Sequence, residues 1–277
     1  MPINFRTAGL ALALSVSGVS AVFAQASLNE VMTRHGVLAK DGLAAAFDAH
    51  AAPTIPVTPG SLATSLAALT ATTGNERIAG AYAFGILAGR SGRAASAPEL
   101  TAAGQSLVIM IGSDDRKTRI AGARVAGRLF AAPFDRSGVR APLPAGLVEA
   151  LFALLNSDNE VDQLVAMDAL GLLRERTAAS SLTDRYYYYR EQNKRSLAGG
   201  ALEAIARIGD GQAAAIVKQA AADKFAEGKD ATALAVAFAR ERLLKDGSIV
   251  TLQRALEEKS RRDQARGYLI ELGASVP

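Results

Sequence analysis

The segment Arg77-Ile-Ala-Gly-Ala-Tyr-Ala-Phe-Gly85 is followed by a close copy, Arg119-Ile-Ala-Gly-Ala-Arg-Val-Ala-Gly127. A weaker copy, Gln163-Leu-Val-Ala-Met-Asp-Ala-Leu-Gly171, comes after it. The period of about 42 to 44 residues is typical of tandem helical units, each of which buries its apolar face against its neighbours. The copies therefore predict a repeat array before any single residue is considered.

The composition of the chain favours an all-α fold. Of its 277 residues, 49% are hydrophobic, only 5% are aromatic and none is Trp, so the core must consist mostly of Ala, Leu, Val and Ile. Alanine is the best helix former, and small side chains allow helices to approach closely. Apolar β-branched runs with a period of two are scarce. The absence of Cys excludes disulfides and thiolate chemistry.

Charges of both signs are mixed along the chain. The 31 basic and 27 acidic side chains leave a formal charge of +4. No basic stripe is dense enough to indicate a nucleic-acid partner, and a mixed solvated surface accounts for the excess.

The amino end has the pattern of a secretory signal peptide. Arg6 is the only charge before Glu30, and residues 8–24 are apolar or small. The small-x-small pattern of cleavage sites is met at Ala24-Gln25-Ala26, and Val22-Phe23-Ala24 is a second choice. We expect residues 1–26 to be removed and the mature protein to be periplasmic or secreted. A retained anchor is the alternative; no later segment is long and charge-free enough to span a membrane.

The mature chain divides into a helical cap at residues 27–52, a Pro-rich linker at 53–60 and a repeat array at 61–277. Three prolines in the linker disfavour a helix there. The array is predicted to consist of helical hairpins joined by short polar turns, whose side chains cap the helix that follows. The expected helices are 61–69 with 76–87, 98–111 with 116–130, 145–155 with 160–173, 181–192 with 196–208, 212–225 with 231–244, and 248–259 with 263–272.

These copies resemble short bacterial HEAT-like repeats, similar to those of phycobilisome lyase proteins. In that family the second helix of a hairpin tends to read Val-Arg-x-x-Ala-Ala-x-Ala-Leu-Gly-x-Ile-Gly-Asp. The repeated Arg and Gly positions match it, as does the closing pair Gly209-Asp210. The resemblance implies an α-solenoid of about five to six hairpins behind the cap. A tetratricopeptide array is the rival, but its Trp/Gly/Tyr signature is missing and the period here is longer.

The resemblance also implies a ladder of Asp-to-Arg contacts that ties the turn of one unit to the helix of the next. Asp114 or Asp115 would pair with Arg119, and Asp158 would stand before Gln163 as a hydrogen-bonding counterpart. We expect these contacts to be structural.

In the family, the second helices line the concave face, and residues three before and one after each small anchor position project into it. These positions include Ile86, Leu172, Val236 and Arg240, and the ones taken as candidates for partner binding are Tyr82, Arg124, Arg128, Asp168, Glu203 and Arg207. Tyr and Arg are enriched at binding hot spots, and the mixture of signs favours a protein or peptide partner over a polyanion. The alternative is an ordinary solvated helix face.

Four consecutive tyrosines, at 186–189, form a second candidate for partner binding. Helical spacing places Leu182, Tyr186 and Tyr189 on one face, which we expect to be core. Tyr187 and Tyr188 would then point elsewhere. They could bind a partner or pack against a neighbouring unit.

No pattern in the chain indicates catalysis. There is no G-x-S-x-G sequence and no strand followed by a phosphate-binding loop. His35, Asp48 and His50 match no metal-ligand spacing, so we expect no metal or cofactor. We expect the glycines in the second helices to allow close packing of neighbouring helices, and we do not expect them to form a ligand groove.

The sequence thus predicts a non-catalytic scaffold or adaptor that binds a protein or peptide partner. A bilin lyase, isomerase or other small-ligand-binding HEAT protein is one alternative. An envelope polysaccharide-associated protein, with Tyr82 stacking on sugars, is the other.

Overall fold

A computed structural model describes residues 59–71, 74–88, 95–131, 142–223 and 231–276. In these ranges the chain forms twelve α-helices and one short 3-10 helix, Arg176–Ala178, and no strand, which confirms the all-α prediction. None of these helices is long and apolar enough to cross a membrane. The helices are α3 (Pro59–Leu69), α4 (Gly74–Ala88), α5 (Ala97–Ile111), α6 (Arg116–Leu129), α7 (Leu147–Leu155), α8 (Glu160–Leu172), α9 (Ala179–Glu191), α10 (Arg195–Ile208), α11 (Ala213–Ala222), α12 (Ala231–Leu244), α13 (Ile249–Ala255) and α14 (Arg262–Glu271).

Several predicted helix boundaries, among them those of α3 and α13, differ from the structure by two residues or more. α3 begins at Pro59, inside the predicted linker, because proline is tolerated in the first turn of a helix, where its missing N–H has no intrahelical partner. α13 ends at Ala255 instead of residue 259, since the chain there passes into turns closed by i→i+3 hydrogen bonds. The predicted signal peptide, the cap with His35, Asp48 and His50, and the rest of the linker lie outside the described residues.

The described chain divides into two compact units, with the division inside α5 between Ala103 and Gly104. In the first unit, α3 packs against α4. Gly80 of α4 is the reason the two helices come so close. A Cβ at this position would lie 2.3 Å from the backbone nitrogen of Leu69.

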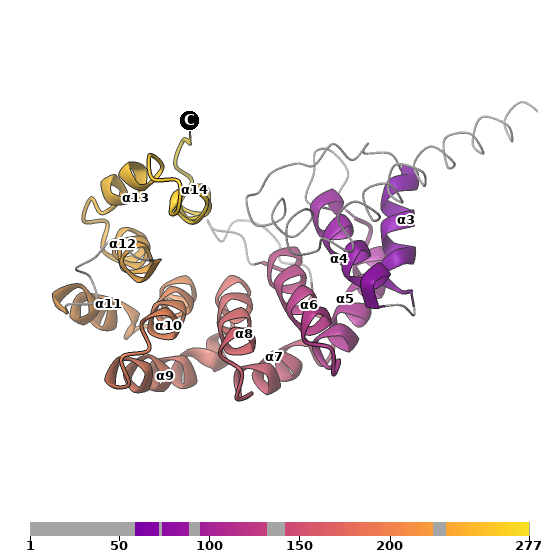
Figure 1. The fold of residues 1–277 in the computed structure, drawn as a ribbon, viewed down its shortest axis with the longest axis horizontal. Helices are drawn as coiled ribbons and strands as arrows, with labels where there is room; N and C mark the ends of the chain where they lie inside the picture. The colour runs from indigo at the N-terminus through magenta and orange to yellow at the C-terminus, as the bar shows by residue number, and fades with distance from the viewer. Residues whose placement is uncertain (1–58, 72–73, 89–94, 132–141, 224–230, 277) are drawn as a thin grey trace, which may run out of the picture. The chain divides into compact units, whose positions relative to one another are not determined.

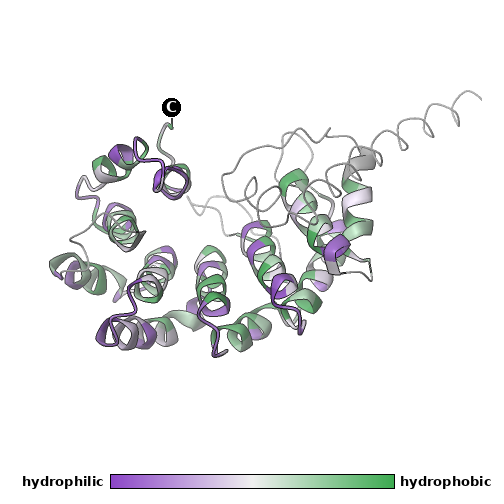
Figure 2. Ribbon diagram, in the orientation of Figure 1, coloured by the Kyte–Doolittle hydropathy of each residue, from purple (hydrophilic) through white to green (hydrophobic). Residues whose placement is uncertain are grey.

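In the second unit, α6, α8, α10 and α12 form a row in which each helix packs on the next (Figure 1). α7, α9 and α11 pack against α8, α10 and α12 as the other helix of each hairpin. Figure 2 shows that α7 is mostly apolar, whereas α9 and α14 are largely hydrophilic. This succession of hairpins is compatible with a helical repeat.

Glycines let neighbouring helices of this row touch through their backbones. A Cβ at Gly127 of α6 would lie 2.8 Å from the Cα atom of Ala169 in α8, and one at Gly171 would lie 2.7 Å from the Cα atom of Ala204 in α10. These glycines recur at the same repeat position because each faces the next helix. The prediction that the recurring glycines serve close helix packing is confirmed at these two positions.

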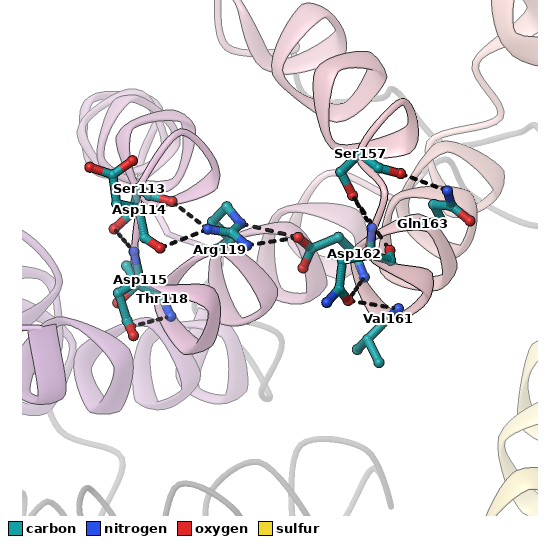
Figure 3. Close-up of polar contacts among 10 residues, drawn as sticks. Ser113, Asp114, Asp115, Thr118, Arg119, Ser157, Val161, Asp162 and Gln163 are labelled. Carbon is teal, nitrogen blue, oxygen red and sulfur yellow. Dashed lines mark hydrogen bonds and ion pairs between the residues drawn. The ribbon is translucent and has the colours of Figure 1, made fainter.

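Arg119 joins two hairpins, but through a partner that the sequence did not indicate. Its Nε and Nη2 atoms donate to Oδ2 of Asp162 in α8, at 3.2 and 2.8 Å (Figure 3). Its Nη1 atom donates to the backbone carbonyls of Ser113 and Asp114. The expected pairing with the Asp114 or Asp115 side chain is therefore wrong.

Asp115 instead caps α6. Its carboxylate accepts hydrogen bonds from the backbone N–H and the hydroxyl of Thr118. Gln163 likewise does not pair with Asp158, and its amide nitrogen donates to the Ser157 carbonyl at 2.6 Å. Short acidic side chains in a turn accept hydrogen bonds from the N–H groups of the following helix. Arg119 therefore pairs with a carboxylate of the next hairpin.

The repeated Arg or Gln position makes the same backbone contact in three hairpins. Arg77, Arg119 and Gln163 each donate to the carbonyl oxygen six residues earlier, at 2.8, 3.0 and 2.6 Å. The contact fixes the turn of each hairpin to its second helix. This explains in physical terms why the repeat begins with a long side chain that donates hydrogen bonds.

Arg119→Met is expected to destabilise the protein by about 1 to 2 kcal/mol, because it leaves the buried carboxylate of Asp162 without its cation. Urea unfolding measures the loss. The double variant Arg119→Met, Asp162→Leu should recover part of it, since no charge is then left unpaired. Equal losses in the single and double variants would contradict this account.

Candidate functional site

Five of the residues predicted to face a partner line one groove, of about 550 Å³, in the second unit. Arg124 and Arg128 come from α6, Asp168 from α8, and Glu203 and Arg207 from α10. They converge because they hold corresponding positions on helices that pack in a row, and residues four apart share a helix face. The remaining polar lining comes from α14 and comprises Asp263, Gln264, Tyr268 and Glu271.

Arg207 lies at the centre of the ionic contacts in this groove, although its side chain is only 7% exposed. Its Nη1 atom lies 2.7 Å from Oδ1 of Asp168 and 3.6 Å from Oε2 of Glu203. Its Nε atom donates to both carboxylate oxygens of Glu271, each at 3.0 Å. Burial disfavours the charged guanidinium, but Glu271, Asp168 and Glu203 outweigh it and raise the pKa of Arg207.

A second buried guanidinium supports the same cluster. The Arg242 side chain is 8% exposed, its Nη1 atom lies 3.5 Å from Oε1 of Glu271, and its Nε atom donates to the carbonyl of Ala206. Both guanidiniums also lie over the ring of Phe238, at 5.4 Å for Arg207 and 5.9 Å for Arg242. Cation–π contacts of this kind strengthen when water is excluded.

Glu203 is the most perturbed carboxyl group of the groove. Burial raises its pKa to about 7, against the effect of Arg207 and of a hydrogen bond from Tyr268, while Asp168 and Glu271 raise it further. The Tyr268 hydroxyl donates to Glu203 and accepts from Nε2 of Gln264 at 2.8 Å. Burial and the neighbouring Glu203 also hold the pKa of Tyr268 well above its usual value.

The raised pKa of Glu203 predicts a pH-dependent stability. The folded protein holds this proton up to about pH 7, whereas the unfolded chain releases it near the ordinary value of 4.5. Stability from this group is therefore greatest below pH 4.5, falls as the pH rises to about 7, and changes little above. The shift corresponds to at most about 3 kcal/mol, and we expect about 2, since the side chain retains some exposure.

Glu203→Gln removes this penalty and keeps an oxygen for the Tyr268 hydroxyl. Relative to the unmodified protein, the free energy of unfolding of the variant should rise by about 2 kcal/mol when the pH is raised from 4.5 to 8.5. Urea unfolding at the two pH values measures this difference. Glu149→Gln, on an exposed position of α7, is the control and should show no such change. A difference between variant and parent that is the same at both pH values would refute the assignment.

A smaller pocket of about 360 Å³ adjoins the groove and shares Asp168, Glu203 and Gln264 with it. The rest of its lining is uncharged and comes from α8, α10 and α12: Leu164, Ser196, Gly199, Gly200 and Thr232. No basic residue is among the described residues that line it. The two cavities therefore differ in their charged lining: the larger one carries arginines as well as carboxylates, whereas the charged residues of the smaller one are carboxylates.

The other predicted site residues do not reach the groove. Tyr82 is buried in the first unit. Tyr187 is half-buried, and its hydroxyl donates to Oε1 of Gln219 in α11 at 2.9 Å, so it packs against the neighbouring hairpin. Tyr188 is 55% exposed on α9. Tyr186 and Tyr189 are buried, which confirms their prediction as core residues.

The contribution of α14 to the groove was missed. The repeat register places none of the predicted partner-facing positions on this helix. Its Gln264, Tyr268 and Glu271 are spaced four and three residues apart, which places them on one helix face. This polar stripe, which includes an aromatic residue, was the signal that α14 turns polar groups toward another part of the protein.

The described residues contain no group of three or more His, Cys, Asp or Glu side chains arranged to hold a metal ion. The site belongs to the class of mixed-charge grooves formed between the helices of an all-α protein and stabilised by a buried ion-pair network. Comparisons with protein families, with characterised proteins and with solved structures find no match to this chain.

Proposed function

We propose that the chain is a non-catalytic scaffold or adaptor of HEAT-like helical repeats that binds a protein or peptide partner in the groove between α6, α8, α10 and α14. The observation that carries the proposal is the convergence of Arg124, Arg128, Asp168, Glu203 and Arg207 on one cavity. The repeat register together with the polar character of the side chains predicts these positions. An ordinary solvated helix face would not require a cavity with an organised ionic lining.

The chemistry of the groove favours a peptide over a polysaccharide. Sugars are bound by stacking on exposed aromatic rings, but the rings of Tyr82 and Tyr268 are both buried. Ile270 of α14 supplies an exposed apolar side chain beside the charged ones. Arginine together with exposed apolar groups is typical of protein interfaces.

The perturbed pKa of Glu203 follows from its buried ionic neighbours and does not by itself indicate an enzyme. We further propose that the amino-terminal signal directs the protein to the periplasm or the exterior. Cell fractionation and amino-terminal sequencing of the mature chain test this part.

Photo-crosslinking tests the proposed groove. A benzophenone amino acid is introduced at Ile270, which is 43% exposed in the groove, or at Val250 of α13, which is 45% exposed and lies outside its lining. We expect a discrete protein adduct from position 270 and none from position 250 in the exported fraction of the producing cells. The adduct should disappear when Arg124 and Arg128 are replaced with glutamine.

Absence of any adduct at position 270, or identical adducts at both positions, would refute the groove as the binding surface. An adduct with a pigment or a polysaccharide would replace the proposal with one of its alternatives. Circular dichroism of each variant establishes that the helices are intact.

A further inference from the structure

The buried ionic cluster contains one carboxylate more than it has guanidiniums. Among the ion pairs of the described residues, Asp168, Glu203 and Glu271 surround Arg207, and Arg242 adds a second positive charge through Glu271. Both guanidiniums are almost fully buried, so solvent screens the imbalance poorly. A buried charge without a counterpart is costly, and the imbalance thus favours a further cation.

Asp168 is the place where such a cation would enter. Its side chain is 41% exposed, the most open of the three carboxylates. It uses Oδ1 for Arg207, while the side chain also borders the smaller pocket together with Glu203. An incoming positive group would therefore meet two carboxylates and no cation in the lining of that pocket.

We propose that the smaller pocket receives a lysine or arginine side chain of the peptide partner, whose charged end pairs with Asp168 and Glu203. The inference rests on the proposed function and specifies its ligand. A metal ion is disfavoured because the described residues provide no set of three ligating side chains. A pocket of about 360 Å³ is within the range of sites that enclose small organic groups.

The larger groove indicates what accompanies the basic side chain. Arg124 and Arg128 line its α6 side, beyond the shared residues Asp168 and Glu203. A peptide that crosses from the smaller pocket to the α6 side of the groove passes from the carboxylates Asp168 and Glu203 to the guanidiniums Arg124 and Arg128. The preferred partner therefore carries an acidic residue near its lysine or arginine.

The titration of Glu203 supports this arrangement. With a pKa of about 7, the group is partly protonated at neutral pH, and the proton offsets the excess negative charge. The charged and polar groups that face it are Asp168 of α8, Arg207 of its own helix, and Gln264, Tyr268 and Glu271 of α14. A bound ammonium or guanidinium favours the ionised carboxylate, so binding should release protons.

The test begins with a displayed library of random twelve-residue peptides, selected on the full chain and counter-selected on the Arg124→Gln, Arg128→Gln double variant. We expect the selected peptides to share a Lys or Arg with Asp or Glu nearby. Their affinities are then measured by fluorescence anisotropy. Asp168→Asn should weaken binding about 10-fold, whereas Asp184→Asn on the exposed side of α9 should change it less than about 2-fold.

Two further measurements separate a ligand contact from a structural role. Gln264→Lys places an ammonium at the shared lining and should abolish binding without removing a carboxylate. Calorimetry in two buffers of different ionisation enthalpy should detect proton release on binding at pH 7, and Glu203→Gln should eliminate it.

The outcomes distinguish the two proposals. Groove-dependent peptides without a basic residue would overturn the inference and leave the proposed function standing. Basic peptides that bind Asp168→Asn and Gln264→Lys as tightly as the parent would overturn the inference as well. A library that yields no groove-dependent peptide would overturn both.

Discussion

Replacing Arg207 with methionine is expected to destabilise the protein by about 3 to 5 kcal/mol, the range found when one partner of a buried ion pair is removed. The reason is local. Asp168, Glu203 and Glu271 all lie within ion-pair distance of this one guanidinium. Methionine fills a similar volume, so the loss reports the charge and its hydrogen bonds more than the packing. Urea unfolding at pH 8 is the measurement.

Lys194→Met is the matched control for that variant. Lys194 forms an ion pair with Glu160 at 2.9 Å, and both of these side chains are largely exposed. Exposed pairs contribute about 0 to 1 kcal/mol, so the control should be nearly neutral. The Arg207→Met defect should also shrink at low pH, where the carboxylates are protonated. Similar losses of stability in the two variants would show that the buried cluster contributes no more to stability than an exposed ion pair.

The helices were predictable because their determinants are local. Asp115 and Asn159 cap α6 and α8, and the turns before them were recognised from the same polar residues. The groove positions Asp168 and Arg207 were also predictable, since the repeat register carries a helix face from one hairpin to the next. The repeat register also predicted that Tyr82 faces the partner, but this residue is buried in the first unit.

The long-range partners could not be predicted from the sequence. Arg119 pairs with Asp162 of the next hairpin, and Arg207 pairs with Glu271, 64 residues later. Each pairing depends on how the hairpins are placed in space, which no local pattern encodes. The division of the chain inside α5 is unforeseen for the same reason, because the repeat pattern continues across it.

Gly171→Val is expected to cost about 3 kcal/mol or more. Even the Cβ of an alanine at this position would lie 2.7 Å from the Cα atom of Ala204 and 3.1 Å from its Cβ atom. The obstacle is backbone, which cannot rotate away, so α8 and α10 must separate and lose part of their packing. Overpacking of a close contact costs about 1 to 3 kcal/mol and occasionally more, and the two methyl groups of valine increase it.

Gly267→Ala separates this effect from helix propensity. Gly267 also lies within a helix, α14, but a Cβ there would meet no atom within 4 Å. Alanine is favoured over glycine in a helix interior by about 1 kcal/mol, so this variant should be stabilised by roughly that amount. Gly171→Ala should be destabilised despite the same gain. Because α8 and α10 carry Asp168 and Arg207, their separation at Gly171→Val should also weaken partner binding in the groove. Thermal unfolding and peptide affinity measured on the three variants decide the matter, and stabilisation at both glycines would show that the close contact between α8 and α10 is not required.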